Sequence, residues 1–203
     1  MPGILGIIFG IIGLRKTRDP RIGGKGLAIT GISLGAASIL MSTCMISVMV
    51  PALSRAREVA NRVKCAHNMR QIGVAIKQYN AAHNGANPKS LEDLISAENL
   101  TGDLFVCTDT SDTAAPGSTP QEIAQSLSTG GHLSYVYVGK GLTSTASPQA
   151  ILLYEPISNH REEGSNFLFS DGHVEFLLRG GAENIISQLE QGHNPPKPGN
   201  FQQ

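Results

Sequence analysis

The sequence predicts an α+β protein in which one long helix packs on a small antiparallel sheet, with a short apolar helix before it. Residues 26–50 contain no charged side chain, and apolar residues then recur every three or four positions as far as residue 83. That spacing is the period of an amphipathic helix. Short β-branched or aromatic runs follow, and the last contains Asp171-Gly172, a hairpin signal.

The first helix is expected over residues 3–14, an apolar segment too short to cross a bilayer alone. Because the chain begins inside this apolar run, we also consider a longer first helix from an upstream start. Pairs of glycines four residues apart occur here and in the next segment, and this spacing lets two membrane helices approach closely. These glycines are Gly6, Gly10, Gly31 and Gly35. The prediction is a helical hairpin, and the alternative is chance spacing in a chain with 23 glycines.

Residues 26–50 are long enough to cross the ~30 Å hydrocarbon layer, so a lipid bilayer is an expected partner. Basic residues at 15–25 should face the cytoplasm, which would place the C-terminal part outside it. A second basic cluster at residues 55–64 makes the charge difference nearly a tie. That cluster could bind anionic headgroups, or it could be a solvated helix face with Glu58 and Arg62 as an i, i+4 pair.

Beyond Pro51, where a kink is expected, the amphipathic half should place one stripe of side chains against the sheet. The residues of this stripe are Leu53, Ala56, Ala60, Val63, Met69, Ile72, Ile76 and Tyr79. The net charge is zero at a pI of about 7.0. A general basic field is therefore absent, and nucleic acid is not an expected partner.

The three cysteines allow one disulfide. Cys44 lies in the uncharged stretch and is expected to be a small packing residue. If the C-terminal part is extracytoplasmic, Cys65 and Cys107 could form a bond that stabilises the fold by ~3–4 kcal/mol. Two buried free thiols are the alternative.

After the long helix, a short helix capped by Ser90 is expected over residues 91–95, and a short strand over 104–107. Most of residues 108–131 should form a surface loop, with one short helix near 121–127. Strands are predicted over 133–138 and 150–154, then a hairpin over 166–178, a closing helix over 182–190 and a disordered tail. The predicted divisions are a membrane anchor at 1–50, a spine and head at 51–192, and the tail at 193–203.

Three motifs carry a resemblance to a known family. They are the run Pro51-Ala-Leu-Ser-Arg-Ala-Arg-Glu, the run Cys65-Ala-His-Asn-Met-Arg-Gln-Ile-Gly, and His160 followed by Asp171-Gly172 after ten residues. Together they resemble bacterial type II secretion pseudopilins of the G-like kind, above all those with a C-terminal signature of His, nine residues, then Asp-Gly. The resemblance covers about residues 50–178. Residues 3–40 instead look like a two-helix membrane domain of unknown function.

The resemblance implies a pilin-like head outside the cytoplasm, anchored in the bacterial inner membrane. It also implies other pilin-like subunits or secretion-system proteins as possible partners. One departure is clear, because residues 29–34 carry neither the Gly-Phe cleavage site nor the glutamate of prepilins. Processing by a prepilin peptidase is therefore not expected.

An enzyme site would have to combine His160, Asp171 and His173 with Glu155 or Glu175. Their spacing matches no catalytic or zinc motif, so we expect no enzyme and no cofactor. A structural role for His160, Asp171 and Gly172 in loop and turn bonds is favoured. A calcium ion near Asp171 is the alternative, since some pilin-like heads hold one. The sequence thus predicts a non-enzymatic assembly protein, or else a free-standing ligand-binding or sensor module of the same fold.

Overall fold

The computed structural model describes residues 8–9, 11–12, 15 and 25–197. The chain forms two compact units, Met1–Arg57 and Glu58–Gln203, and each is described by itself. Gly6 and Gly10 lie outside the described residues. Gly31 is half-buried and Gly35 is buried, but the helix predicted to cover them is largely outside the described part, so the predicted hairpin is not tested.

Helix α2, Lys25–Ala82, belongs to both units and includes Pro51. In the first unit, many of its large apolar side chains are exposed. They include Ile29, Leu34, Leu40, Met41, Met45, Val48, Met49, Val50 and Leu53. Of the residues described, none belongs to a helix with both the length and the apolar character needed to cross a membrane. The membrane span predicted at residues 26–50 is therefore not confirmed.

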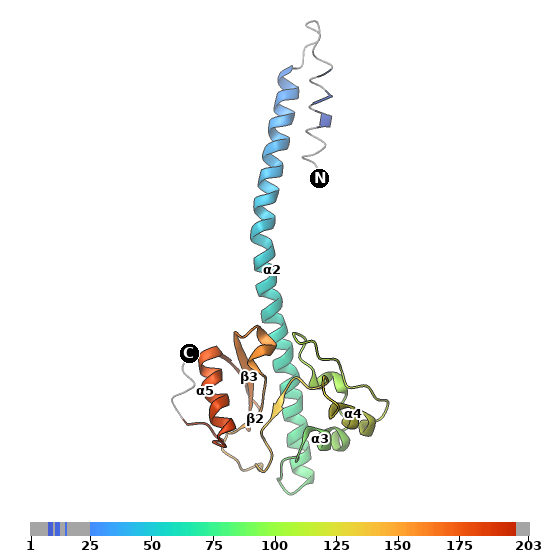
Figure 1. Cartoon of the computed structure of the whole chain (residues 1–203), viewed down its shortest axis with the longest axis vertical. Coiled ribbons are helices and arrows are strands. Elements are labelled where there is room, and N and C mark those ends of the chain that lie inside the picture. The colour runs from blue at the N-terminus through green and yellow to red at the C-terminus, as the bar shows by residue number, and fades with distance from the viewer. Residues whose placement is uncertain (1–7, 10, 13–14, 16–24, 198–203) are drawn as a thin grey trace. The chain divides into compact units, whose positions relative to one another are not determined.

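In the second unit, α2 lies between the sheet and two small helices (Figure 1). Cys65, Met69, Ile72 and Ile76 have no exposed surface, and they belong to the cluster that joins α2 to the sheet. The predicted stripe is thus confirmed from Met69 onward. Val63 is 60% exposed, so the stripe was extended too far toward the N-terminus.

The sheet has four antiparallel strands in the order β1-β2-β3-β4, and the predicted α+β class is confirmed. The strands are β1 Val136–Tyr137, β2 Ile151–Tyr154, β3 Gly164–Phe169 and β4 Val174–Leu178. Leu153 and Leu168 pack on the α2 side. Ile151, Tyr154 and Phe167 pack on the opposite side, under helix α5, Arg179–Glu190.

A register irregularity lies between Ile151 and Leu153 in β2. Leu152 and Leu153 are consecutive, yet both belong to the cluster on the α2 side. A bulge places two neighbouring residues opposite one partner and so changes the normal alternation of faces. The bulge therefore adds one more apolar side chain to the α2 side of β2.

The predicted hairpin is confirmed as β3–β4, with Leu168 opposite Val174 and Asn166 opposite Phe176. Only Gly172 of the Asp-Gly pair has a positive φ, of +96°, so the turn is not a two-residue turn of the I′ type. Phe167 lies opposite Glu175. The phenylalanines of β3 therefore face α5, whereas Val174 and Phe176 lie on the α2 face.

Helix α3, Leu91–Glu98, is capped by the Ser90 side chain as predicted. Helix α4, Pro120–Leu127, begins with a capping box between Thr119 and Glu122. The strand predicted at 104–107 is wrong, because residues Gly102–Phe105 form a 3₁₀ turn, η1. This turn buries the consecutive Leu104 and Phe105 together, which a strand with alternating faces would not do.

The C-terminal tail is in part ordered. The side chain of Asn194 accepts a bond from the backbone N–H of Ile151 at 2.8 Å and donates to its carbonyl at 2.7 Å. Asn194 thus joins the start of the predicted tail to β2, and residues 198–203 lie outside the described part.

Candidate functional site: a buried carboxylate–histidine cluster

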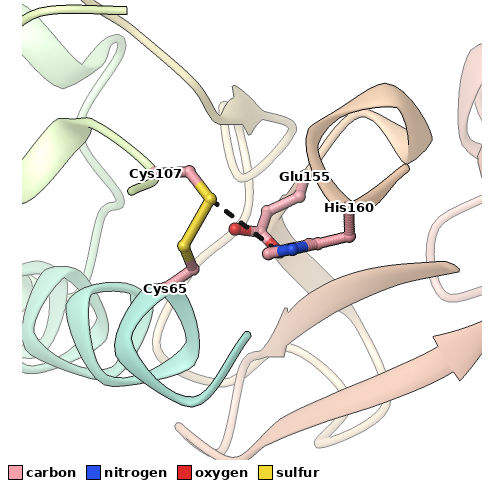
Figure 2. A group of neighbouring side chains, drawn as sticks. All are labelled: Cys65, Cys107, Glu155 and His160. Atoms are coloured by element: carbon pink, nitrogen blue, oxygen red, sulfur yellow. Dashed lines mark hydrogen bonds and ion pairs between the residues drawn. A yellow bond between two sulfur atoms is a disulfide. The ribbon is translucent and has the colours of Figure 1, made fainter. Parts of the chain in front are cut away.

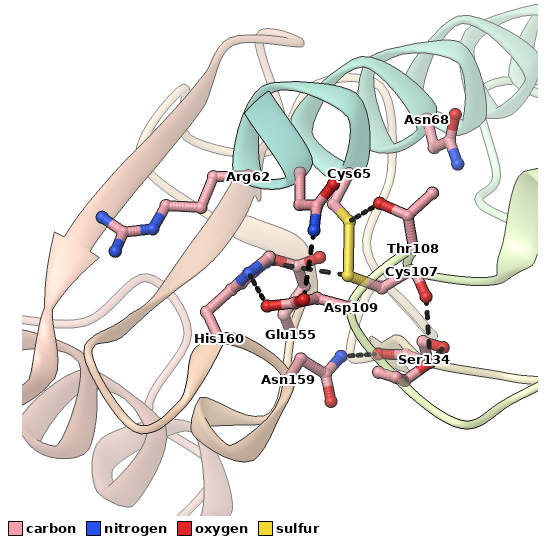
Figure 3. The surroundings of a disulfide bond; sticks show 12 residues. Arg62, Cys65, Asn68, Cys107, Thr108, Asp109, Ser134, Glu155, Asn159 and His160 are labelled. Atoms are coloured by element: carbon pink, nitrogen blue, oxygen red, sulfur yellow. Dashed lines mark hydrogen bonds and ion pairs between the residues drawn. A yellow bond between two sulfur atoms is a disulfide. The ribbon is translucent and has the colours of Figure 1, made fainter. Parts of the chain in front are cut away.

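Four ionisable side chains from four separate segments meet inside the second unit; Figure 3 shows three of them, Asp109, Glu155 and His160. Glu58 comes from α2, Asp109 from the loop after η1, Glu155 from the end of β2, and His160 from the short helix η2, Ile157–His160. Glu155 and His160 have no exposed surface, and Glu58 is 5% exposed. We call these four residues the buried cluster.

A disulfide between Cys65 and Cys107 borders the buried cluster, with its Cα atoms 5.3 Å apart (Figure 2). This is the pairing inferred from the sequence. The bond holds the loop of Asp109 against α2, where Asn61 Nδ2 donates to Asp109 Oδ1 at 3.1 Å. Cys107 Sγ lies 3.7 Å from His160 Nε2. The disulfide thus sets the position of one carboxylate and contacts the imidazole.

The imidazole of His160 uses its two nitrogens differently. Nε2 lies 3.0 Å from Glu155 Oε2, and the same oxygen accepts a bond from Asn166 Nδ2 at 2.7 Å. Nδ1 lies 3.3 Å from Glu58 Oε1 and 3.8 Å from Asp109 Oδ2. One ring nitrogen therefore has a fixed carboxylate partner, and the other faces two carboxylates at longer range.

The charges of the cluster oppose the effect of burial. Burial alone would lower the pKa of His160, but the hydrogen bond and charge of Glu155, with the charges of Glu58 and Asp109, raise it overall. Arg62 Nε lies 3.4 Å from Glu58 Oε1, which agrees with the predicted i, i+4 pair. Arg161 Nε lies 3.6 Å from Glu58 Oε2 but is 67% exposed.

Several polar atoms of the cluster have no hydrogen-bond partner among the described residues. These atoms are Glu58 Oε2, Asp109 Oδ2, Glu155 Oε1 and His160 Nδ1. A buried polar atom without a partner costs about 1–3 kcal/mol, and more when it is charged. The described contacts therefore leave these four buried polar atoms of the cluster unsatisfied.

The predicted site residues divide between two places. His160 meets Glu155, whereas Asp171, Gly172 and His173 form the exposed turn of the β3–β4 hairpin. His160 adjoins Glu58, and Lys77 Nζ donates to the carbonyl of Asp171. Glu58 and Lys77 are nineteen residues apart on α2, which is roughly 28 Å at ~1.5 Å rise per residue. The signature residues His160 and Asp171 therefore do not share a site.

Asp171 has a structural role in the turn. Its Oδ1 accepts bonds from His173 N at 3.0 Å and from the His173 ring at 2.5 Å. Slight burial raises the pKa of Asp171, but these bonds from His173 and the nearby charge of Lys77 lower it overall. Glu175 lies exposed on β4 and joins no cluster within the described residues.

Sequence reasoning missed Glu58 and Asp109 as members of a site. The sequence predicts Glu58 only as the partner of Arg62, and Asp109 as part of a surface loop. The pairing of Cys65 with Cys107 was the one signal that could have found Asp109, because it brings that loop to α2.

Comparison with known proteins gives one partial match. A family model described as a protein of unknown function (SBP_bac_10, DUF1559) matches residues 54–100. This segment contains the second half of α2 and the whole of α3. No curated protein matches the chain, and no solved structure does. The closer assignment to pseudopilins of type II secretion receives no support from these comparisons.

Proposed function

We propose that this chain is a pilin-like, non-enzymatic subunit of a bacterial envelope assembly of the type II secretion or pilus class. The observation that carries the proposal is the position of α2. Its second half packs in the core of an α+β head. Its first half has exposed apolar side chains such as Leu40, which is 74% exposed. Exposed apolar side chains along this much of a helix are typical of a surface that packs on another apolar surface.

The proposed location of the head is outside the cytoplasm, with the first half of α2 held at the inner membrane. The Cys65–Cys107 disulfide supports the location, because disulfides persist in oxidising compartments. The uncharged sequence of residues 26–50 and its exposed apolar side chains support the attachment. The attachment is inferred from the uncharged, exposed apolar side chains of this segment.

The lack of catalysis is also part of the proposal. The imidazole of His160 is fully buried, and the thiols of Cys65 and Cys107 are joined in the disulfide. A catalytic pair needs a nucleophile or a substrate within hydrogen-bond reach. In the part of the chain that the structure describes, the buried cluster offers neither a free nucleophile nor an open approach.

Cysteine cross-linking in membranes of the native bacterium tests the assembly. In a Cys44→Ser background, Leu40→Cys and Met41→Cys should each give cross-linked dimers under mild oxidation. Lys140→Cys, an exposed position of the head, is the matched control and should not. The proposal would be overturned if both α2 variants stay monomeric and the chain is recovered outside the membrane fraction.

A second candidate is a ligand-binding or sensor module, which one observation favours. An open pocket of about 440 Å³ lies beside the C-terminal end of α2, with Lys77, Asn80, Asn87 and Ser144 in its wall. Small-molecule sites are commonly concave, mostly apolar and lined by a few polar groups. A thermal-shift screen of small polar ligands, repeated on Asn80→Leu, tests this candidate. A ligand that stabilises the parent chain and not the variant would favour it.

A further inference from the structure

We propose that the buried cluster is a binding site for one divalent transition-metal ion, with zinc as the first ion to test. The ligands would be His160 Nδ1, a carboxylate oxygen of Glu58 and a carboxylate oxygen of Asp109. Ligand atoms of these three residues all lie within 4.8 Å of one another. A histidine nitrogen with two carboxylates is a mixed N/O set that zinc and its neighbours accept.

The distances agree with such a site. Zinc–nitrogen and zinc–oxygen bonds of ~2.0–2.2 Å at tetrahedral angles place ligand atoms about 3.3 Å apart. His160 Nδ1 is 3.3 Å from Glu58 Oε1 and 3.8 Å from Asp109 Oδ2. The His160–Asp109 distance is the longer of the two, and the Asp109 side chain is 16% exposed.

The other ring nitrogen of His160 has the partner that a metal-bound histidine usually has. Metal ligands of this type donate their second N–H to a carboxylate, which fixes the tautomer and turns the free nitrogen toward the ion. Glu155 Oε2 is in that place, 3.0 Å from Nε2. Asn166 Nδ2 donates to the same oxygen, so Glu155 is a positioning residue held from β3.

Three polar atoms without a hydrogen-bond partner among the described residues belong to the proposed ligands themselves. They are Glu58 Oε2, Asp109 Oδ2 and His160 Nδ1, and both Glu58 and His160 are more than nine-tenths buried. Arg62 does not fully compensate the carboxylates, because it also bonds Glu163 and stacks over Phe176. A divalent ion would supply two positive charges to these three residues.

The two sulfur atoms are excluded from this set while the disulfide is present. Cys65 and Cys107 also lie within ligand distance of Glu155 and His160, but a metal binds the thiolate form of cysteine. In the oxidised chain the site is therefore of the N/O type. A site in the reduced chain would use the thiols instead and would be a different one.

The test is zinc binding by the full, oxidised chain after removal of metal with a chelator. Equilibrium dialysis with metal analysis should find one equivalent of zinc per chain, and the melting temperature should rise. Glu155→Gln changes a residue that only positions a ligand and should reduce zinc affinity by about 10-fold. Glu58→Gln and Asp109→Asn change the ligands themselves, and each should reduce zinc affinity by more than ~100-fold. Glu175→Gln removes an equal charge at an exposed position and should bind as the parent chain does.

A second measurement uses the unsubstituted chain, in case the variants do not fold. Cobalt(II) in place of zinc should give the visible absorption of a tetrahedral site without a thiolate charge-transfer band. A thiolate band, or binding that requires reductant, would assign the ion to Cys65 and Cys107 and overturn the proposal. The proposal would also be overturned if the oxidised parent chain retains no zinc, or if Glu175→Gln loses as much zinc affinity as Glu58→Gln and Asp109→Asn do.

Discussion

His160 Nε2 lies 3.0 Å from Glu155 Oε2, and neither side chain has any surface exposed to solvent. Removal of either partner from such a pair is costly, because it leaves the other charge buried and unpaired. Asn166 satisfies one oxygen of Glu155. The rest of the pair depends on Glu58, Asp109 and the disulfide, so the stability of the head and the properties of the cluster are coupled.

Asn166→Ala should destabilise the head by about 1–3 kcal/mol, because it leaves the buried Glu155 Oε2 with one donor fewer. The measurement is chemical denaturation monitored by circular dichroism. Asn184→Ala is the control, since Asn184 is exposed and its side chain bonds Gln188 on the same helix. Equal effects of the two variants would contradict the importance of the Asn166–Glu155 bond.

The Cys65→Ser, Cys107→Ser double variant should lose about 3–4 kcal/mol of unfolding free energy, as expected for a loop closed across 42 residues. The parent chain should lose a similar amount in reductant. The double variant should be insensitive to reductant, which serves as the internal control. A parent chain with full thiol reactivity before reduction would show that the bond does not form.

Gly172→Ala should destabilise the hairpin by roughly 1–2 kcal/mol, because Gly172 has a φ of +96°, which disfavours a residue with a Cβ atom. Gly180→Ala is the matched control. Gly180 lies in α5 with nothing within 4 Å of an added Cβ, so this change should be neutral or stabilise by up to ~1 kcal/mol. Comparison of the two melting temperatures checks the prediction.

Asp171 should give a small dependence of stability on acid pH. Its pKa is lower in the folded chain, so its contribution is present above the unfolded pKa of ~3.9 and is lost as pH falls through the folded value. Because the side chain is 46% exposed, the effect should stay below ~1 kcal/mol. Denaturation of Asp171→Asn from pH 5 to pH 2 should show a correspondingly shallower decline, and an unchanged slope would contradict the prediction.

Local features of the fold could be predicted from the sequence. The cap at Ser90 and the turn at Gly172 depend on neighbouring residues, and both occur where expected. The strand predicted at 104–107 failed because a four-residue apolar run has no period that separates a strand from a helical turn. The exposure of Val63 follows from where the head begins to cover α2. The period of the apolar residues does not show where that cover begins.

The candidate site could not be predicted as a whole. Glu58 and His160 are far apart in the sequence and meet only because η2 packs beside α2, so no spacing motif joins them. Glu155 and His160 are near neighbours in the sequence, and that part of the cluster was considered from the sequence. A cluster assembled by tertiary packing from four segments leaves no local signal, in contrast to a metal motif on one helix.

The Cys65–Cys107 bond also determines how the chain responds to mechanical tension. A pull applied to the two ends of the polypeptide passes from α2 across the sulfur atoms to the loop of Asp109, and the enclosed segment carries no load. That segment spans 42 residues, or about 140 Å of extended chain at ~3.3–3.6 Å per residue. A single molecule stretched in an optical trap should therefore extend by that much less when oxidised than when reduced, with helix α3 held inside the unloaded loop.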